Sequence, residues 1–343
     1  MNLEFSARGS NPAHLSNISG IPLPNLPPYN IKGNLSDRDQ GWDIENFIGK
    51  IGDSDLKGKI RIDLSGKQTF VKADLLSKKI DLDDFGPMLG IAPDTGPGET
   101  ASPAQQREAK KQAASKFSLP TKPIDFKKLE NIHVDIKLTS STIKTDLPID
   151  NLTTHVIIQN GHLTLSPLNF GVADGKISSH VEIDARAKPV QTKVETEIRH
   201  LRLKQILKKW DISADSAGLI GGKAIYWLKG NSLADMFSSA DGGMLMLMTG
   251  GKLDDLLVEL SGLDLGEALV ALFDKESNTQ INCAFLDLPT KNGLITISKL
   301  IIDTQDTIFL GSGSINLKKE QLDVVIDPRP KDLSVFSARA PLY

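Results

Sequence analysis

The sequence has only one cysteine, Cys283, and few aromatic residues. One thiol excludes an internal disulfide framework and leaves the redox compartment undetermined. Aromatic residues make up 5% of the chain, so its apolar surface is built mostly from Leu, Ile and Val. No stretch reaches the roughly 18 apolar residues that cross a bilayer, and the start of the chain has no signal peptide. Residues 2–9 instead alternate like the second half of a strand, so we expect a cytosolic protein or a piece of a longer one.

Neither charge nor a chemical motif singles out a ligand. The net charge is −3 and the pI is about 6.1, which gives no reason to expect nucleic acid, because phosphate binding needs concentrated basic charge. The six histidines occur singly, outside the spacings that bind metals. The glycines of GSGSIN (311–316) precede a strand, whereas a phosphate loop precedes a helix. We therefore expect no enzyme activity, no metal and no cofactor.

Alternation with a period of two recurs along most of the chain. It is clearest in DLKGKIRIDLS (55–65), NIHVDIKLT (131–139) and KISSHVEIDAR (176–186). One face of each segment is aliphatic and the other is polar, which is typical of antiparallel strands with one face in water. The positions predicted to share the aliphatic face are Leu56, Ile60, Ile62, Val134, Ile136, Val181 and Ile183.

The segment GGMLMLMTGG (242–251) differs because both of its faces are apolar. As a strand it directs Met244, Met246 and Met248 to one side and its leucines to the other. Two amphipathic helical patterns follow in residues 252–275, and a third covers 200–210. We expect one face of 242–251 to pack on the helices that follow it.

Weak internal repetition divides the chain. NGHLTLSPL (160–168) and NGLITISKL (292–300) match at an offset of 132, and each begins with an Asn-Gly turn signal. Residues 62–85 and 183–206 match more loosely at an offset of 121. We expect degenerate repeats over residues 1–92 and 120–343. The Pro-, Gly-, Ala- and Lys-rich segment 93–119 is predicted to be a mobile insertion with a transient helix over 104–115.

These patterns predict a mainly β fold with a few short amphipathic helices. A long antiparallel sheet with one aliphatic face can close into a barrel, pair as a sandwich or curl into a trough for an apolar ligand. Periodicity alone leaves all three open.

Several motifs resemble the C-terminal region of the AsmA family of bacterial envelope proteins. The most specific are IDT (302–304), GSGSINL (311–317) and PRPKD (328–332), within a similarity that covers 283–342. Residues 52–64 and 75–90 also resemble the family. The resemblance implies an elongated β-groove of repeating units, each with several strands and a short crossing helix, and it favours the trough.

The resemblance also implies a function. Family members are typically held in the inner membrane by an N-terminal helix, which this sequence lacks, and extend through the periplasm. They are associated with phospholipid movement to the outer membrane and with outer-membrane protein assembly. We therefore expect a non-enzymatic protein that carries phospholipid between the membranes, with outer-membrane or periplasmic proteins as further partners. The alternative is a scaffold for outer-membrane protein assembly. The predicted groove residues are Leu56, Ile60, Ile62, Val134, Ile136, Val181, Ile183, Met244, Met246 and Met248.

Overall fold

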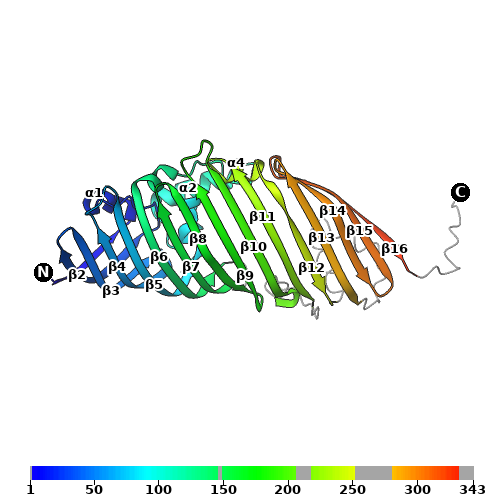
Figure 1. The fold of residues 1–343 in the computed structure, drawn as a ribbon, viewed down its shortest axis with the longest axis horizontal. Helices are drawn as coiled ribbons and strands as arrows, with labels where there is room; N and C mark the ends of the chain where they lie inside the picture. Colours follow the sequence, from blue (N-terminus) through cyan, green and yellow to red (C-terminus); the bar gives the residue numbers. More distant parts are fainter. Residues whose placement is uncertain (1, 146–148, 206–217, 252–279, 332–343) are drawn as a thin grey trace.

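The computed structural model shows one long sheet whose strands follow each other in chain order (Figure 1). It describes residues 2–145, 149–205, 218–251 and 280–331. The expected helical pattern at 252–275, and residues 206–210 of the one at 200–210, lie outside these residues. Residues 200–202 of the second pattern are the end of a strand rather than helix. Within the described residues no helix is long and apolar enough to cross a membrane.

Sixteen strands make up the described sheet. They are β1 (Asn2–Gly9), β2 (Tyr29–Arg38), β3 (Gly41–Ile51), β4 (Ser54–Asp63), β5 (Thr69–Asp81), β6 (Ile132–Lys144), β7 (Ile149–Gln159), β8 (His162–Val172), β9 (Gly175–Asp184), β10 (Gln191–Arg202), β11 (Leu219–Lys229), β12 (Asp241–Thr249), β13 (Ile281–Lys291), β14 (Leu294–Thr304), β15 (Thr307–Asn316) and β16 (Gln321–Pro330). The short helices are η1 (Pro12–Leu15), α1 (Ser16–Ser19), η2 (Leu82–Leu89), α2 (Pro103–Ala113), η3 (Phe126–Asn131) and α4 (Leu233–Ser238), where η marks a 3₁₀ helix. The mainly β prediction is confirmed. A sandwich would need a second sheet, and the described residues form only one, with β1 and β16 at its two ends.

Every neighbouring pair of strands is antiparallel except β5 and β6, which run parallel. A parallel pair needs a crossover that carries the chain back to the starting end of the strand. Residues 82–131, including η2, α2 and η3, form this crossover. The expected helix at 104–115 corresponds to α2, whose N-terminus has a capping box between Ser102 and Gln105.

The repeated segments 160–168 and 292–300 have the same local structure. Asn160 and Gly161 both have positive φ, 50° and 75°, and Asn292 and Gly293 match them at 49° and 72°. Each Asn-Gly pair turns the chain into the next strand, β8 or β14. Each of these strands also has a register shift at the same offset, between residues 165 and 168 in β8 and between 297 and 300 in β14. The repeat therefore includes an irregularity of the strand as well as its turn.

The pairing register defines an apolar face that continues from strand to strand. One row of paired residues across β3 to β11 is Trp42, Ile62, Val71, Val134, Ile158, Leu163, Ile183, Thr192 and Leu228. Almost every member is apolar, because the period-two alternation of each strand is matched in phase to that of its neighbour. The opposite side of β3 to β10 is here called the polar face, since it carries most of the charged residues of these strands.

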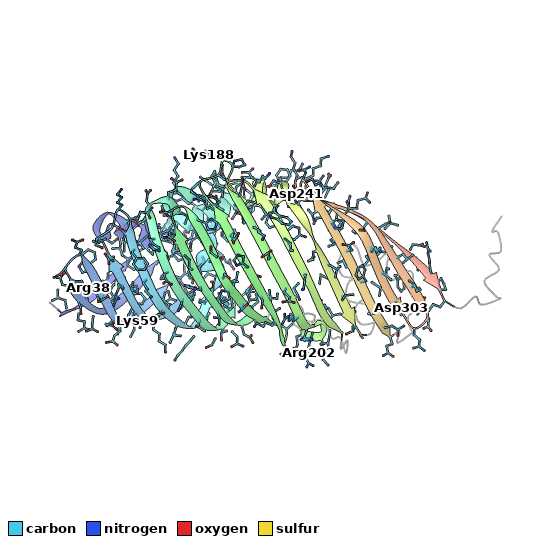
Figure 2. All side chains as sticks on the ribbon, in the orientation of Figure 1. Arg38, Lys59, Lys188, Arg202, Asp241 and Asp303 are labelled. Carbon is cyan, nitrogen blue, oxygen red and sulfur yellow. The ribbon has the colours of Figure 1, made fainter. Side chains whose placement is uncertain are left out.

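The crossover lies on the apolar face and carries the chain from the rim at which β5 ends to the opposite rim, at which β6 begins. Phe85 of η2 packs against a cluster that includes Leu138 and Leu168, and Phe126 of η3 packs against Leu228. In Figure 1 the crossover lies behind the strands, in agreement with these contacts. The upper rim carries the turn at Lys188 and the start of β12 at Asp241, and the lower rim carries Arg202 (Figure 2).

Residues 118–124 are attached along the upper rim. The backbone N–H groups of Ser118 and Leu119 donate to the Glu320 carboxylate at 2.7 and 2.9 Å. The Ala234 N–H donates to Pro120 O at 3.0 Å, and the Ile124 N–H donates to Asn231 O at 2.7 Å. The crossover is thereby fixed to turns that lie more than a hundred residues away in sequence.

Candidate functional site

All ten predicted groove residues lie on the apolar face. Leu56, Ile60 and Ile62 alternate along β4, and Ile60 is joined to Ile136 through its partner Ala73. Farther along the sheet the same register connects Ile183 and Val181 to Met244, Met246 and Met248 through β10 and β11. The structure thus brings together on one surface residues that were selected from separate segments.

The first half of this face is covered by the chain itself. Ile62 and Val134 are 8% and 4% exposed, and they form a buried cluster with Ile21 from the loop between α1 and β2. Ile60 and Ile136 pack against the same cluster, and Leu56 is also buried at 8% exposure. These five positions belong to a protein core, and in this structure they are not a surface for a ligand.

The second half of the face is only partly covered. Val181, Met244 and Met246 are half-buried and belong to none of the buried clusters of the described residues. Ile183 packs at the edge of the cluster around Phe126, and Met248 packs beside Ile281 and Phe309. The accessible part of the predicted site is therefore centred on β9 and β12.

Further half-buried apolar residues extend this region. Leu165 and Val194 are the partners of Val181 on the two neighbouring strands, and Leu286 pairs with Met246. Leu286 was missed because β13 reads INCAFLDL, which is apolar at positions of both parities. Leu165 was missed because it directly precedes the register shift in β8, where alternation no longer assigns a face. We call Leu165, Val181, Val194, Met244, Met246 and Leu286 the open apolar region. Val194 lies at its border, because it also packs against the buried cluster around Phe126.

The segment 242–251 places its methionines and leucines on opposite faces, as alternation predicts. The methionines lie on the apolar face, whereas Leu245 and Leu247 lie on the other face with exposed fractions of 41% and 50%. The helices expected to pack on one of these faces fall outside the described residues. The structure therefore tests only the alternation of this strand.

Ion pairs form between neighbouring strands on the polar face. Arg61 Nε lies 2.8 Å from Asp43 Oδ1, and this hydrogen bond lowers the pKa of the Asp43 carboxyl. Asp135 accepts from His155 at 2.7 Å and faces Lys72 at 3.7 Å, and its pKa is lowered first by the histidine. These side chains are substantially solvated, so each pair contributes little to stability. Their main effect is to keep this face in water.

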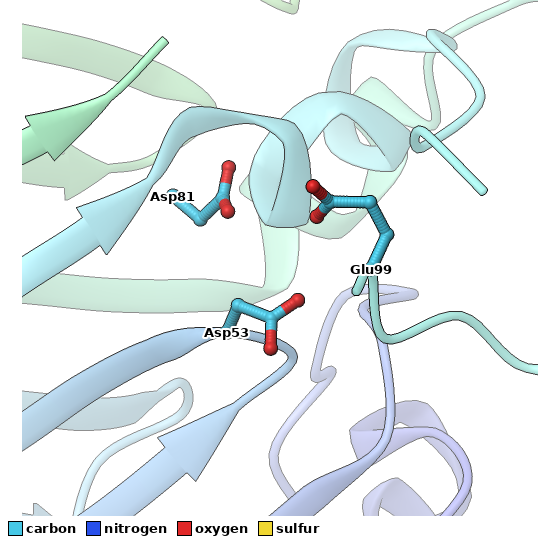
Figure 3. A group of neighbouring side chains, drawn as sticks. All are labelled: Asp53, Asp81 and Glu99. Atoms are coloured by element: carbon cyan, nitrogen blue, oxygen red, sulfur yellow. The ribbon is translucent and has the colours of Figure 1, made fainter. Parts of the chain in front are cut away.

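Three carboxylates, Asp53, Asp81 and Glu99, converge beside the end of β5 (Figure 3). Lys144 pairs with two of them: its Nζ lies 2.8 Å from Asp81 Oδ2 and bonds to Glu99. These contacts raise the pKa of the Lys144 ammonium, with Asp81 the larger cause. Thr100 donates its hydroxyl and its N–H to Asp53, both at 2.9 Å. The lysine supplies the positive charge here, and the cluster ties the start of the crossover to β4, β5 and β6.

A fourth carboxylate, Asp84, anchors η2 to the turn between β3 and β4. Its Oδ2 accepts from the N–H groups of Asp53 and Ser54, both at 2.9 Å, and from the Ser54 hydroxyl at 2.6 Å. Burial raises the pKa of Asp84 to about 6 in spite of these hydrogen bonds. Neither anchor could be predicted from the sequence, because the members of each are separated by tens of residues.

The family model of AsmA matches residues 25–300 of this chain. The chain belongs to the AsmA family. AsmA family protein YhjG of Escherichia coli (strain K12) is 30% identical to it over 353 residues, which cover 100% of this chain and 51% of YhjG. The chain thus spans about half the length of this curated relative. No solved structure matches it. AsmA family proteins are bacterial envelope proteins, and the family is linked to outer-membrane function.

Proposed function

We propose that this AsmA family chain carries phospholipid along the apolar face of its sheet, without catalysis and without a cofactor. The open apolar region carries the proposal, because it is a continuous aliphatic surface that no second sheet covers in the described structure. Acyl chains that cover it would remove apolar area from water at about 25 cal/mol per Å². Headgroups would remain at the solvated side of the groove.

The shape of the surface supports transport more than storage. A second row of paired residues crosses from β8 to β14 without a polar side chain, so an acyl chain along it meets chemically similar side chains at each step. Its members are Phe170, Ile177, Ile198, Gly222, Met246, Leu286 and Leu300. Methionines at the centre of the region suit disordered chains, because their side chains are flexible and polarisable. In the envelope, we propose that the whole protein is anchored in the inner membrane, extends through the periplasm and delivers lipid towards the outer membrane.

The test compares two double variants of one strand. Met244→Asp with Met246→Asp places two carboxylates in the open apolar region, and Leu245→Asp with Leu247→Asp places two on the opposite face of β12. After purification from a bacterial periplasm, lipid per chain is measured by native mass spectrometry and by extraction. We expect the methionine variant to lose lipid by about tenfold or more, since a carboxylate buried under acyl chains costs several kcal/mol. The leucine variant should retain its lipid.

Thermal unfolding of both variants separates lost binding from lost folding. Equal lipid loss in two folded variants would contradict the apolar face as the binding surface. A folded, lipid-free wild-type chain would contradict the proposed function itself.

The outer edges of the sheet favour a second candidate. In the described structure the outer edges of β1 and β16 have no strand partner, so each could add a strand from another polypeptide. A scaffold for outer-membrane protein assembly would use these edges. If the Met244→Asp and Met246→Asp variant carries no lipid and still supports outer-membrane protein assembly, the result would favour the scaffold function.

A further inference from the structure

The crossover carries exposed apolar side chains close to several cations. Met88, Leu89 and Ile91 are 45%, 46% and 37% exposed, and Phe117 is 47% exposed. The segment 103–122, which includes Phe117, carries five basic residues, Arg107, Lys110, Lys111, Lys116 and Lys122, and one acidic residue, Glu108, whereas residues 82–102 around Met88, Leu89 and Ile91 carry four acidic residues and no basic one. This local excess of positive charge contrasts with the net charge of −3 of the whole chain.

The basic side chains of α2 point away from the contacts that hold the helix. Gln112 bonds to the backbone of Gly90 and Ala92, and Glu108 pairs with Lys122 at 2.8 Å. Positions 108 and 112 are one turn apart, so they define the held side of α2. Arg107, Lys110 and Lys111 take no part in these contacts, and all three are exposed.

Most of this charge is not neutralised. On the polar face, cations such as Arg61 and Lys72 have carboxylate partners on neighbouring strands. Among the described residues, by contrast, Arg107, Lys110, Lys111 and Lys116 form no ion pair, and only Lys122 of the five has a carboxylate partner. The crossover therefore offers an anion several cations at once, beside apolar side chains.

We propose that this basic side of the crossover, together with Met88, Leu89, Ile91 and Phe117, binds the anionic headgroup of a phospholipid whose acyl chains lie on the apolar face. The inference rests on the proposed function. The crossover lies on the apolar face and is held along the upper rim as far as the turns at Asn231 and Glu320, so lipid that moves over the open apolar region passes beside it. Opposite charges attract the phosphate ester, and the exposed apolar residues contact the adjoining chain segments.

The test uses the full chain and vesicles with equal amounts of phosphatidylglycerol and phosphatidylcholine that have the same acyl chains. The chain is incubated with the vesicles and re-isolated, and its bound lipids are counted by mass spectrometry. We expect the wild type to be enriched in phosphatidylglycerol by at least about threefold, since each nearby Lys or Arg favours an anionic lipid. A variant with Arg107, Lys110, Lys111 and Lys116 all changed to Gln should bind as much lipid in total, at a ratio near that of the vesicles.

A matched variant controls for total charge. It replaces Lys32, Lys57, Lys176 and Lys299 with Gln, because these are exposed lysines away from the crossover with no ion pair in the described structure. It should keep the wild-type enrichment. Equal enrichment in all three proteins, or equal loss in both variants, would overturn the headgroup site while leaving lipid carriage intact. A wild-type chain that takes up neither lipid would instead contradict the proposed function.

Two further arms identify the source of the phosphate. Millimolar glycerol 3-phosphate should leave the enrichment unchanged, and its abolition would assign the site to free phosphate esters. Vesicle flotation addresses the membrane surface. Loss of flotation in the crossover variant with an unchanged lipid ratio would make the crossover a bilayer-docking surface and would overturn the headgroup site.

Discussion

Asp84 has a buried carboxyl group whose hydrogen bonds and desolvation act in opposite directions. Three donors stabilise its carboxylate, but burial is the larger effect and raises its pKa to about 6. Such an acid binds its proton more tightly in the folded state than in the unfolded chain. Folding is therefore favoured at low pH by this group, and that contribution is lost as pH rises from about 4 to above 6.

The substitution Asp84→Asn should remove this pH dependence. The wild type should lose up to about 3 kcal/mol of unfolding free energy between pH 4 and pH 7 relative to the variant, since one pKa unit corresponds to about 1.4 kcal/mol. Asn keeps one oxygen in place to accept the bonds from Asp53 and Ser54. Chemical denaturation at several pH values measures the difference. Parallel pH profiles for the two proteins would show that Asp84 does not titrate in this range.

At the scale of elements, the two Asn-Gly turns are a natural comparison. A Cβ on Gly161 would meet only side-chain atoms of Arg186 and Glu130, at 3.1 Å and beyond. A Cβ on Gly293 would lie 2.5 Å from the backbone oxygen of Ser238, at the end of α4. Both glycines have positive φ, so alanine strains either turn, but only Gly293 also blocks a neighbouring helix.

We therefore expect Gly161→Ala to cost about 1 kcal/mol and Gly293→Ala to cost about 2 kcal/mol or more. Urea denaturation of the two variants gives the comparison. Equal losses would mean that α4 moves aside at no cost. Far-ultraviolet circular dichroism checks that both variants keep the strand content of the wild type.

The sequence predicted which side chains of each strand share a face. It did not predict which parts of the apolar face are covered by other segments of the chain. Leu56, Val134 and Val181 were assigned to one face because each strand alternates with a period of two, and the register agrees. Val134 is buried because Ile21 packs on it from a loop more than a hundred residues earlier in the chain, whereas Val181 has no such cover and stays accessible. The sequence likewise favoured antiparallel pairing throughout, because alternation does not report the direction of a neighbour. The parallel β5–β6 pair depends on the path of the crossover.

At the scale of the whole molecule, an open sheet with a half-exposed apolar face should depend on its ligand for part of its stability. Lipid that binds the folded chain but not the unfolded chain adds about 2.7 kcal/mol when its concentration is a hundred times the dissociation constant. We expect delipidation to lower the melting temperature of the wild type. Melting of the Met244→Asp and Met246→Asp variant should be the same before and after lipid removal. A wild type that melts identically in both states would contradict ligand-dependent stability.

The parallel pair also has a consequence for biosynthesis. A chain made from its N-terminus can pair β1 to β5 as successive hairpins, but the second edge of β5 has no partner until residues 82–131 have been made and β6 has followed them. For that interval the nascent protein ends in an unpaired strand, the kind of edge that recruits other chains. Lys72, Lys78 and Lys79 all lie in β5. Charged side chains, lysine above all, discourage unwanted pairing at such an edge, so β5 carries its own protection against aggregation until its partner arrives.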